Sequence, residues 1–383
     1  MKNNYFNITI NMLYATIIVA TTFFFILMGG SLVTSASSTS PLSIPDLSEW
    51  QGSLTASEVK KLKSEVPFVI LRVQYGSGYK DLDFSHNAAL CKKYGLKYGV
   101  YSYSLYTSPS DAKVEAKDLY ERGINASFYV NDYEQQTVTS GTTNTATVDW
   151  YKELHKLAPH KRILFYSYNS FAQEYASAAM KDYDGYWLAD YTSVQPTGID
   201  YYLWQYTDNW YTSALGQYVD ASKEHLKNTS WFLSSRPISY KKVVYPSKNG
   251  YDIWNNLMFT SHGGVTITGK HQYYEARYYY NHYNGRKYYS IYKNNKWIGY
   301  VNAKSMTTLK SGLMSQTIKI IKKNQIIWGN LFFTQKLANT SNYYNDLFSV
   351  KYYYNHPNGS VYYSLYNGNK WVGYVNKNNV TVK

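Results

Sequence analysis

Short apolar runs alternate with amphipathic segments over residues 45–227 of the 383-residue chain. Thr55 and Glu58 have the spacing of a capping box, which predicts the start of a helix. Strands that alternate with helices of this length favour a parallel sheet with helical crossovers, so the predicted fold class is α/β. The pattern predicts strands over 67–75, 96–104, 126–134, 162–168, 185–190 and 201–206, and helices over 55–65, 83–94, 110–122, 147–157 and 170–180. Closure of the sheet into a barrel does not follow from this pattern alone.

The C-terminal part repeats itself at an offset of 74 residues. Tyr278–Thr307 and Tyr352–Thr381 are identical at 19 of 30 positions without a gap. Alternating aromatic residues and Asn-Gly turns are typical of β-hairpins, so we predict two small all-β modules over 244–310 and 311–383. The serine-rich stretch 230–243 is the predicted linker to the preceding domain.

Charge distinguishes these two parts of the chain. Residues 231–383 hold 20 Lys and Arg but 3 Asp and Glu, a net charge of +17, whereas residues 1–230 hold 19 and 22, a net of −3. The sum is +14, so the whole excess lies in the C-terminal part. This asymmetry indicates a near-neutral working domain joined to modules that meet a polyanion. The alternative is that the basic residues only keep an aromatic-rich β surface soluble.

The N-terminus indicates which polyanion is available. Lys2 precedes the apolar run Met12–Met28, and small residues follow around Ala36. This pattern is typical of a bacterial secretory signal over 1–36, with the first domain over 37–229; an uncleaved membrane anchor is the alternative. In both cases we expect the rest of the chain to lie outside the membrane, where a negatively charged cell envelope is the available polyanion. Nucleic acid is then excluded as a partner, and we expect a monomer.

Cysteine and histidine usage gives no sign of a metal or cofactor. Cys91 is the single cysteine, so a disulfide framework and a cysteine-based zinc site are excluded. The eight histidines show no spacing typical of metal ligands. We therefore predict neither a metal nor a cofactor.

Carboxylates follow an apolar strand at Asp132 and Glu134. Because side chains alternate along a strand, both should project from one face while Tyr133 points away. Two neighbouring carboxyl groups perturb each other's ionisation, which separates a carboxylate from a protonated acid, as glycoside cleavage requires. The alternative is a solvated strand end. Asp46 opens the domain and Asp220 closes it, so a closed barrel would add both to the pair; alternatively, each is a cap or turn aspartate.

Seven motifs follow one another in a fixed order within residues 44–225. They are Asp46-x-Ser48-x-x-Gln51-Gly52, Phe68-Val69-Ile70-Leu71-Arg72 before Gly76 and Asp81, Gly99-Val100-Tyr101, Asp132-x-Glu134, Trp187-Leu188-Ala189-x-Tyr191, Trp204-Gln205-Tyr206 and Val219-Asp220. In this order they resemble glycoside hydrolase family 25, the lysozymes that cut peptidoglycan between N-acetylmuramic acid and N-acetylglucosamine. The resemblance implies an irregular β/α barrel with an acidic groove at the C-terminal ends of its strands.

The resemblance also implies roles for the matching residues. Glu134 corresponds to the general acid, and Asp132 to the residue that stabilises positive charge or orients the substrate's N-acetyl group, the internal nucleophile of a retaining reaction. Asp46 and Asp220 correspond to further groove carboxylates. The substrate-binding positions correspond to Tyr101, Trp187, Tyr191, Gln205 and Arg72. For the aromatic residues among them, core packing is the alternative.

Two positions depart from the family pattern. Ser102 stands where the family often has histidine, and Tyr133 where an aliphatic residue is common, which affects the details of the sugar subsites. The C-terminal repeats resemble bacterial GW-type modules, which have a Src-homology-3-like (SH3-like) barrel and hold proteins to cell walls. The matching segments are Lys296–Tyr300 and Lys370–Tyr374, although here the glycine follows the tryptophan.

Together these features predict a secreted lysozyme that hydrolyses peptidoglycan. Its two basic modules, residues 244–383, would bind teichoic or lipoteichoic acid phosphates. The alternative from another functional class is a catalytically idle wall-binding or adhesion protein on a lysozyme-like scaffold. Losing Asp132 or Glu134 would favour that alternative, and both are present.

Overall fold

The computed structural model describes residues 42–383. The predicted signal segment 1–36 lies outside the described residues. Within 42–383, none of the helices combines the length and the apolar character needed to cross a membrane.

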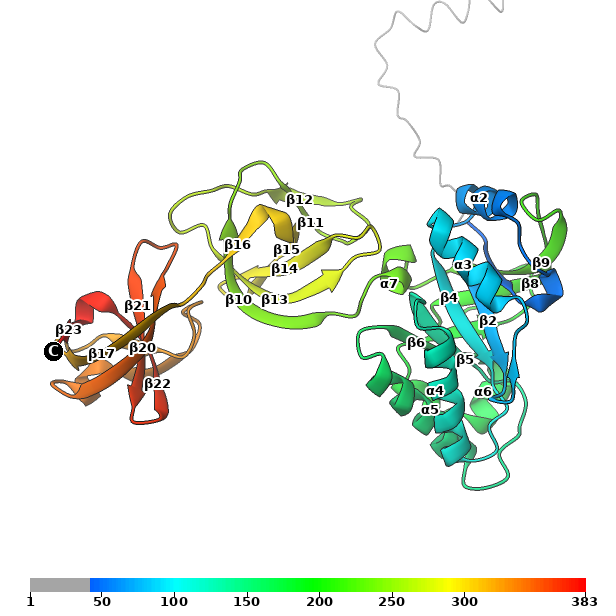
Figure 1. Ribbon diagram of the computed structural model, residues 1–383, viewed down its shortest axis with the longest axis horizontal. Helices are drawn as coiled ribbons and strands as arrows, with labels where there is room; N and C mark the ends of the chain where they lie inside the picture. Colours follow the sequence, from blue (N-terminus) through cyan, green and yellow to red (C-terminus); the bar gives the residue numbers. More distant parts are fainter. Residues whose placement is uncertain (1–41) are drawn as a thin grey trace, which may run out of the picture. The chain divides into compact units, whose positions relative to one another are not determined.

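The first part of the described chain is a β-barrel surrounded by helices (Figure 1). Its strands are β1 (Ile44–Leu47), β2 (Val69–Tyr75), β3 (Tyr79–Lys80), β4 (Tyr98–Tyr103), β5 (Phe128–Asp132), β6 (Arg162–Tyr168), β7 (Gly185–Ala189), β8 (Leu203–Thr212) and β9 (Gln217–Glu224). Eight of them pair in the order β1-β9-β8-β7-β6-β5-β4-β2, and β1 also pairs with β2, which closes the barrel. The predicted α/β class and the barrel implied by the family resemblance are confirmed.

Helices cross between most of the parallel strands. They are α2 (Ala56–Glu65), α3 (Phe84–Tyr94), α4 (Pro109–Arg122), α5 (Thr143–Leu157) and α6 (Asn169–Tyr175), with short 3₁₀ turns η1 (Glu49–Gln51) and η2 (Ala179–Asp182). A further helix, α7 (Thr229–Leu233), follows β9. Both hydrogen bonds of the predicted capping box are present at the start of α2, where the backbone N–H of Glu58 donates to Thr55 and that of Thr55 donates to Glu58. The predicted helix over 170–180 is shorter, because α6 ends at Tyr175.

The end of the barrel differs most from the predicted pattern. The strand predicted over 201–206 continues as β8 to Thr212, and β9 follows as a strand that the sequence did not predict. β8 and β9 are antiparallel, and β9 is also antiparallel to β1. The polar sequence of β9 hid it, because it lacks the apolar run that marks a buried parallel strand.

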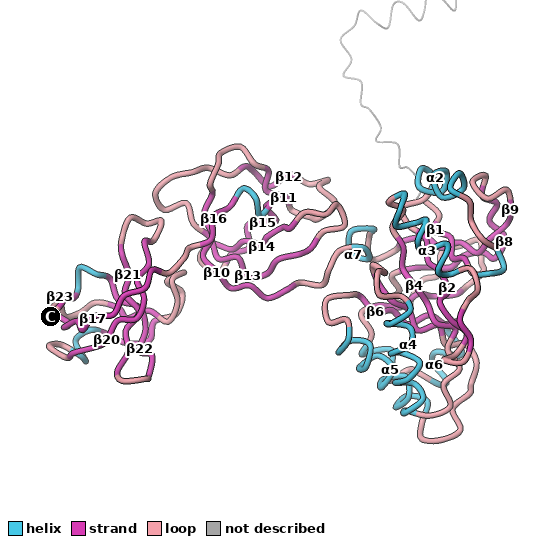
Figure 2. The backbone as a smooth tube through the Cα atoms, in the orientation of Figure 1, coloured by secondary structure: helices cyan, strands magenta, loops and turns pink. Residues whose placement is uncertain are grey.

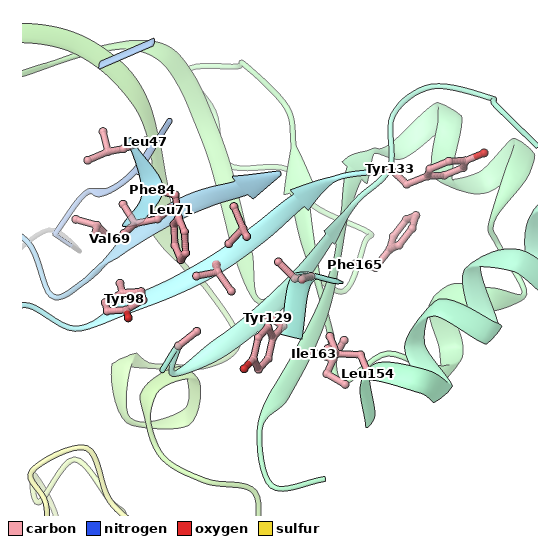
Figure 3. Packing of buried hydrophobic residues seen from close by; sticks show 14 of the residues in the cluster. Leu47, Val69, Leu71, Phe84, Tyr98, Tyr129, Tyr133, Leu154, Ile163 and Phe165 are labelled. Atoms are coloured by element: carbon pink, nitrogen blue, oxygen red, sulfur yellow. The ribbon is translucent and has the colours of Figure 1, made fainter. Parts of the chain in front are cut away.

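Alternation along the strands builds two cores. One set of side chains, including Leu71, Tyr129 and Phe165, packs against the helices (Figure 3). The opposite set fills the inside of the barrel; it comprises Ile44, Phe68, Ile70, Phe128, Val130, Leu164, Tyr166, Trp187, Leu203, Phe232 and Leu233. The strands thus present mostly apolar residues to the inside of the barrel.

Most of the predicted linker, 230–243, is regular structure. Its first residues belong to α7, whose Phe232 is fully buried, with its ring centroid 5.8 Å from that of Phe68 and 5.7 Å from that of Phe128. Its last residues begin β10 (Ile238–Pro246), a strand of the first module. The serine-rich composition hid both elements, since Phe232 and Leu233 are an apolar pair too short to show periodicity.

Two antiparallel sheets of seven strands make up the rest of the chain, and Figure 2 shows strands and loops dominating this part. The first module contains β10, β11 (Asp252–Trp254), β12 (His262–Val265), β13 (Tyr274–Asn281), β14 (Lys287–Lys293), β15 (Lys296–Asn302), η3 (Ala303–Ser305) and β16 (Met306–Thr308). The second contains β17 (Gly312–Ile320), β18 (Ile326–Trp328), β19 (Lys336–Asn339), η4 (Thr340–Tyr343), β20 (Leu347–Asn355), β21 (Val361–Asn367), β22 (Lys370–Asn376), η5 (Lys377–Asn379) and β23 (Val380–Val382). The sheets have equivalent strand orders, β12-β11-β15-β14-β13-β10-β16 and β19-β18-β22-β21-β20-β17-β23, so the sequence repeat corresponds to a structural repeat.

Candidate active site

A pocket of about 240 Å³ lies at the C-terminal ends of the parallel barrel strands. All nine residues predicted for the site line it: Glu134, Asp132, Asp46, Asp220, Tyr101, Trp187, Tyr191, Gln205 and Arg72. Five further residues complete the lining: Ser48, Trp50, Gln51, Tyr103 and Tyr166. The fold therefore brings together residues that are up to 174 positions apart in the sequence, Asp46 and Asp220 (220 − 46 = 174).

Strand pairing places the carboxyl groups. Asp132 is the last residue of β5, and Asp46 lies in β1 directly opposite Asp220 of β9. Opposed residues of an antiparallel pair share one face, so the side chains of Asp46 and Asp220 are close neighbours. The closing pair of strands thus adds two acids to the one at the end of β5.

The turn after β5 returns Glu134 to the pocket. Tyr133 is fully buried in the opposite direction, with its ring stacked on that of Tyr106 at 4.6 Å between centroids. Anchoring Tyr133 in the core holds Asp132 and Glu134 on the pocket side, as the alternation predicts. The aromatic residue at this position therefore serves packing.

Burial and mutual repulsion act on all four carboxyl groups. Burial first, and then the nearby charges of Asp220 and Glu134, raise the pKa of Asp46 well above its ordinary value. Burial and then the charge of Glu134 raise the pKa of Asp132 well above its ordinary value. Asp132 Oδ1 has no hydrogen-bond partner within residues 42–383. The pocket thus favours protons on carboxyl groups that would be ionised in water.

Glu134 and Asp220 are affected less strongly than the two buried aspartates. Burial raises the pKa of Glu134, and a hydrogen bond with Asp132 partly offsets that rise. Burial raises the pKa of Asp220 to about 6, with the charge of Asp208 adding to the effect. Because the four groups share one pocket, the ionisation of one disfavours that of the others, and protonated and ionised carboxyl groups can occur there together.

Gln205 connects the aspartates to the aromatic wall. Its Nε2 donates to Asp46 Oδ2 at 2.9 Å, and its Oε1 accepts from the hydroxyls of Tyr166 at 2.6 Å and Tyr191 at 2.8 Å. Trp187 is held separately by its Nε1, which donates to Ser222 Oγ at 2.8 Å. These bonds fix the side chains before any ligand arrives.

Arg72 is committed to two carboxylates. Its Nε donates to Asp81 Oδ2 at 3.0 Å, and its Nη2 lies 2.9 Å from Glu49 Oε1. The guanidinium still lines the pocket, where its charge opposes the rise in the pKa of Asp132. The contact of Arg72 with substrate stays a prediction. Its ion pairs with Asp81 and Glu49 also stabilise the pocket wall.

Residues 45–215 match the model described as glycosyl hydrolases family 25. This segment is a glycoside hydrolase family 25 domain. The predicted family and the predicted enzyme class, a glycoside hydrolase, are thereby confirmed. The match ends five residues before Asp220, so the closing strand β9 lies beyond it.

Solved structures with similarity to the chain come from phage, bacteria and a fungus. The catalytic domain of the endolysin ply40 from bacteriophage P40 of Listeria monocytogenes is 25% identical, with 49% of this chain and 95% of that chain covered and a TM-score of 0.45. GHIP, a glycosyl hydrolase 25 of Streptococcus pneumoniae, is 23% identical, with 50% and 89% covered and a TM-score of 0.44. A family GH25 lysozyme from Aspergillus fumigatus is 19% identical, with 50% and 96% covered and a TM-score of 0.40. The search of curated proteins gave no match.

Three aromatic residues of the family 25 domain's pocket escaped the sequence analysis. Tyr103 stacks on Tyr75 with 4.6 Å between ring centroids, and Tyr166 meets Trp187 edge to face at 4.6 Å. Trp50 is 82% exposed at the pocket rim. Period-two alternation from Tyr101 could have identified Tyr103, but the pairing of Tyr166 with Asp132 depends on strand register, which the sequence does not display.

The departure at Ser102 lies outside the pocket of the family 25 domain. Ser102 is fully buried on the other face of β4, where its Oγ donates to Glu115 Oε1 at 3.0 Å. Gln74 Nε2 donates to the same Oγ at 3.0 Å. The departure from the family pattern at Ser102 therefore affects the packing of α4 against the barrel rather than the pocket lining.

Proposed function

We propose that the barrel hydrolyses peptidoglycan at the β-1,4 bond between N-acetylmuramic acid and N-acetylglucosamine, with Glu134 as the general acid. The observation that carries this proposal is the convergence of four carboxyl groups, from β1, from the end of β5 and from β9, on one pocket lined with aromatic rings. Burial raises the pKa of Glu134, which favours the protonated form that a general acid needs. The family supplies the reaction class, and the structural relatives described as lysozymes and endolysins fit this substrate.

The first step transfers a proton and breaks one bond. The carboxylic acid of Glu134 gives its proton to the glycosidic oxygen while the bond from that oxygen to C1 of N-acetylmuramic acid breaks. The acetamide oxygen of the same sugar attacks C1 and forms a cyclic, positively charged intermediate. Asp132 orients the acetamide and stabilises this positive charge.

The second step restores the enzyme. A water molecule attacks C1, the acetamide is released, and the water's proton returns to the Glu134 carboxylate, so that C1 keeps its original configuration. Asp46 and Asp220 sustain the proton affinity of the pocket, since the charge of Asp220 acts on Asp46 and on Glu134. Tyr101 and Tyr191 offer ring surfaces to the sugars, the buried Trp187 supports the pocket wall, and Gln205 and Arg72 hold polar groups in place.

The modules keep the enzyme on its substrate. Residues 231–383 carry a net charge of +17, and most of their lysines are at the surface of the described modules, which suits the phosphates of teichoic or lipoteichoic acid. A secreted monomer held in this way acts repeatedly on one wall. The signal at 1–36 supplies the export that this location requires.

The test is an assay of purified Gram-positive walls with residues 37–383. Released reducing ends and free amino groups are measured in parallel, and mass spectrometry identifies the new terminal sugar. We expect new N-acetylmuramic acid reducing ends, lost in Glu134→Gln and unchanged in Glu121→Gln, an exposed glutamate on α4. Turnover retained in Glu134→Gln would contradict the assigned acid. Wall binding without new reducing ends would instead favour the idle adhesion protein.

A further inference from the structure

Each module presents three aromatic rings around one serine on the outer face of its sheet. In the first module, Ser290 of β14 lies opposite Tyr278 of β13 and opposite Tyr300 of β15. Trp297 joins them, because its Nε1 donates to Ser290 Oγ at 3.1 Å and its ring lies 5.4 Å from that of Tyr300. We call Tyr278, Trp297, Tyr300 and Ser290 the first platform.

The second module contains the same arrangement 74 residues later. Ser364 lies opposite Tyr352 and Tyr374, and Trp371 Nε1 donates to Ser364 Oγ, again at 3.1 Å. The rings of Trp371 and Tyr374 are 5.3 Å apart. These four residues are the second platform. Because the same side-chain contacts recur at matching distances in both modules, the rings form a defined arrangement rather than a chance grouping of aromatic residues.

A backbone irregularity brings the tryptophan to this face. Trp297 and Tyr300 are three residues apart, so regular alternation would place them on opposite faces. A register shift between Ile291 and Tyr292 changes the alternation, and Gly299 within it has φ of 148°, a conformation that favours glycine. A Cβ there would lie 2.7 Å from the Trp254 carbonyl oxygen. The second module repeats the shift, with Gly373 at φ of 142°.

Exposure distinguishes the platform rings from core aromatics. Trp297 is 36% exposed, Trp371 38% and Tyr278 37%, whereas Tyr289 on the inner face is buried. Each indole is pinned by its hydrogen bond to serine, so its free ring face is fixed in advance. A fixed, half-exposed aromatic face loses little conformational entropy on binding, which is the property of a recognition surface.

We infer that each platform binds the apolar face of a sugar ring in an uncharged, N-acetylated glycan strand. Aromatic faces suit the C–H side of a pyranose, and the hydroxyl groups of the platform tyrosines can meet the hydroxyl and acetamide groups around that ring. The barrel on the same chain belongs to a glycoside hydrolase, so a glycan ligand keeps both parts on one polymer. This inference rests on the proposed wall location of the modules, and it adds a binding mode that charge does not supply.

The test separates sugar binding from charge binding. Walls stripped of phosphate polymers by acid are incubated at 4 °C with the full chain in 0.5 M NaCl, and the retained protein is measured. The comparison is between wild type, the pair Trp297→Ala and Trp371→Ala, and the control pair Tyr251→Ala and Tyr344→Ala, whose exposed rings lie outside the platforms. The pocket is unchanged in all three, so a difference reports the platforms.

We expect the tryptophan pair to bind stripped walls about tenfold more weakly and the control pair to bind like wild type. A second pair, Tyr278→Ala and Tyr352→Ala, removes rings that donate no side-chain hydrogen bond in the described structure and should show the same loss if the first pair folds poorly. Equal binding by wild type and both platform pairs would overturn the inference. Failure of wild type to bind intact walls at low salt would instead contradict the charge-based anchor, and the stripped-wall comparison would still decide the platforms.

Discussion

The barrel and the modules each contain a cluster of charges of one sign, but the acids of the barrel pocket are buried and the basic residues of the modules are exposed. The barrel places Asp46 and Asp132 in a pocket where burial raises the pKa of both carboxyl groups. Residues 231–383, which include the modules, have a net charge of +17 and hold their basic groups mainly on exposed side chains. Burial shifts the pKa values of neighbouring groups of like charge. Exposed groups keep their charges and attract an oppositely charged polymer, an attraction that salt screens. Under the proposed function, the buried acids perform the chemistry and the exposed basic residues perform the anchoring.

The largest expected effect is on kcat, when an acid of the barrel pocket rather than an acid of a module is replaced by its amide. Asp132→Asn should lower kcat by roughly 100-fold or more, since the buried carboxyl group lies beside Glu134 and acts on the same intermediate. Asp346→Asn removes an exposed acid of the second module and should leave kcat unchanged. The measurement is steady-state release of reducing ends from soluble muropeptides. A small effect of Asp132→Asn would break the distinction between buried and exposed acids.

Removing one core phenylalanine from each region should separate their stabilities. Phe232→Ala should lower the free energy of unfolding of the barrel by about 3–5 kcal/mol, because α7 seals the inner core with this side chain. Phe348→Ala empties the core of the second module instead and should spare hydrolysis of soluble fragments while reducing wall retention. Thermal unfolding followed by activity and by wall binding distinguishes the two. Loss of hydrolysis in Phe348→Ala would show that the regions are not independent.

Salt should act on the modules and not on the barrel. Raising NaCl from 50 to 500 mM should weaken retention on intact walls by roughly tenfold, because exposed charges are screened over a few ångströms at high ionic strength. Hydrolysis of small uncharged muropeptide analogues should change less than twofold, since the carboxyl groups of the pocket are buried. Co-sedimentation and a reducing-end assay measure the two effects. Equal salt sensitivity of wall retention and hydrolysis would contradict the assignment of binding to the modules and hydrolysis to the barrel.

The smallest expected effect is a pH dependence of barrel stability. The pKa of Asp220 is raised to about 6, so the folded state holds its proton more tightly than the unfolded state does. The stabilisation is complete below about pH 4 and is lost as the pH rises through about 6. Between pH 4 and 7, the free energy of unfolding of Asp220→Asn should therefore fall by roughly 1–2 kcal/mol less than that of wild type. Denaturation at both pH values measures this, and Asp200→Asn, an exposed acid, should behave like wild type.

The sequence predicted the parts of the molecule that depend on local pattern. Apolar runs and caps gave most of the parallel strands and helices, and the ordered motifs placed all nine site residues in one pocket. The repeat over Tyr278–Thr307 likewise predicted two related β modules. These features succeed because period and capping are encoded within a few neighbouring residues.

The features that the sequence did not predict depend on register and on partners far along the chain. β9 is polar, and only its pairing with β1 and β8 explains it. Phe232 and Leu233 form too short an apolar segment to indicate a helix that completes the inner core. Tyr166 enters the pocket through its alignment with Asp132. In each case the deciding contact is tertiary, so no local pattern announces it.

The pairing of Asp46 with Asp220 also sets the order in which the molecule becomes an enzyme. One of these residues is near the start of the barrel and the other is 174 positions later, so the pocket cannot assemble until the last strand has docked. Contacts over such a distance are among the slowest to form during folding. A chain that ends before β9 therefore lacks one of the four carboxyl groups that line the pocket.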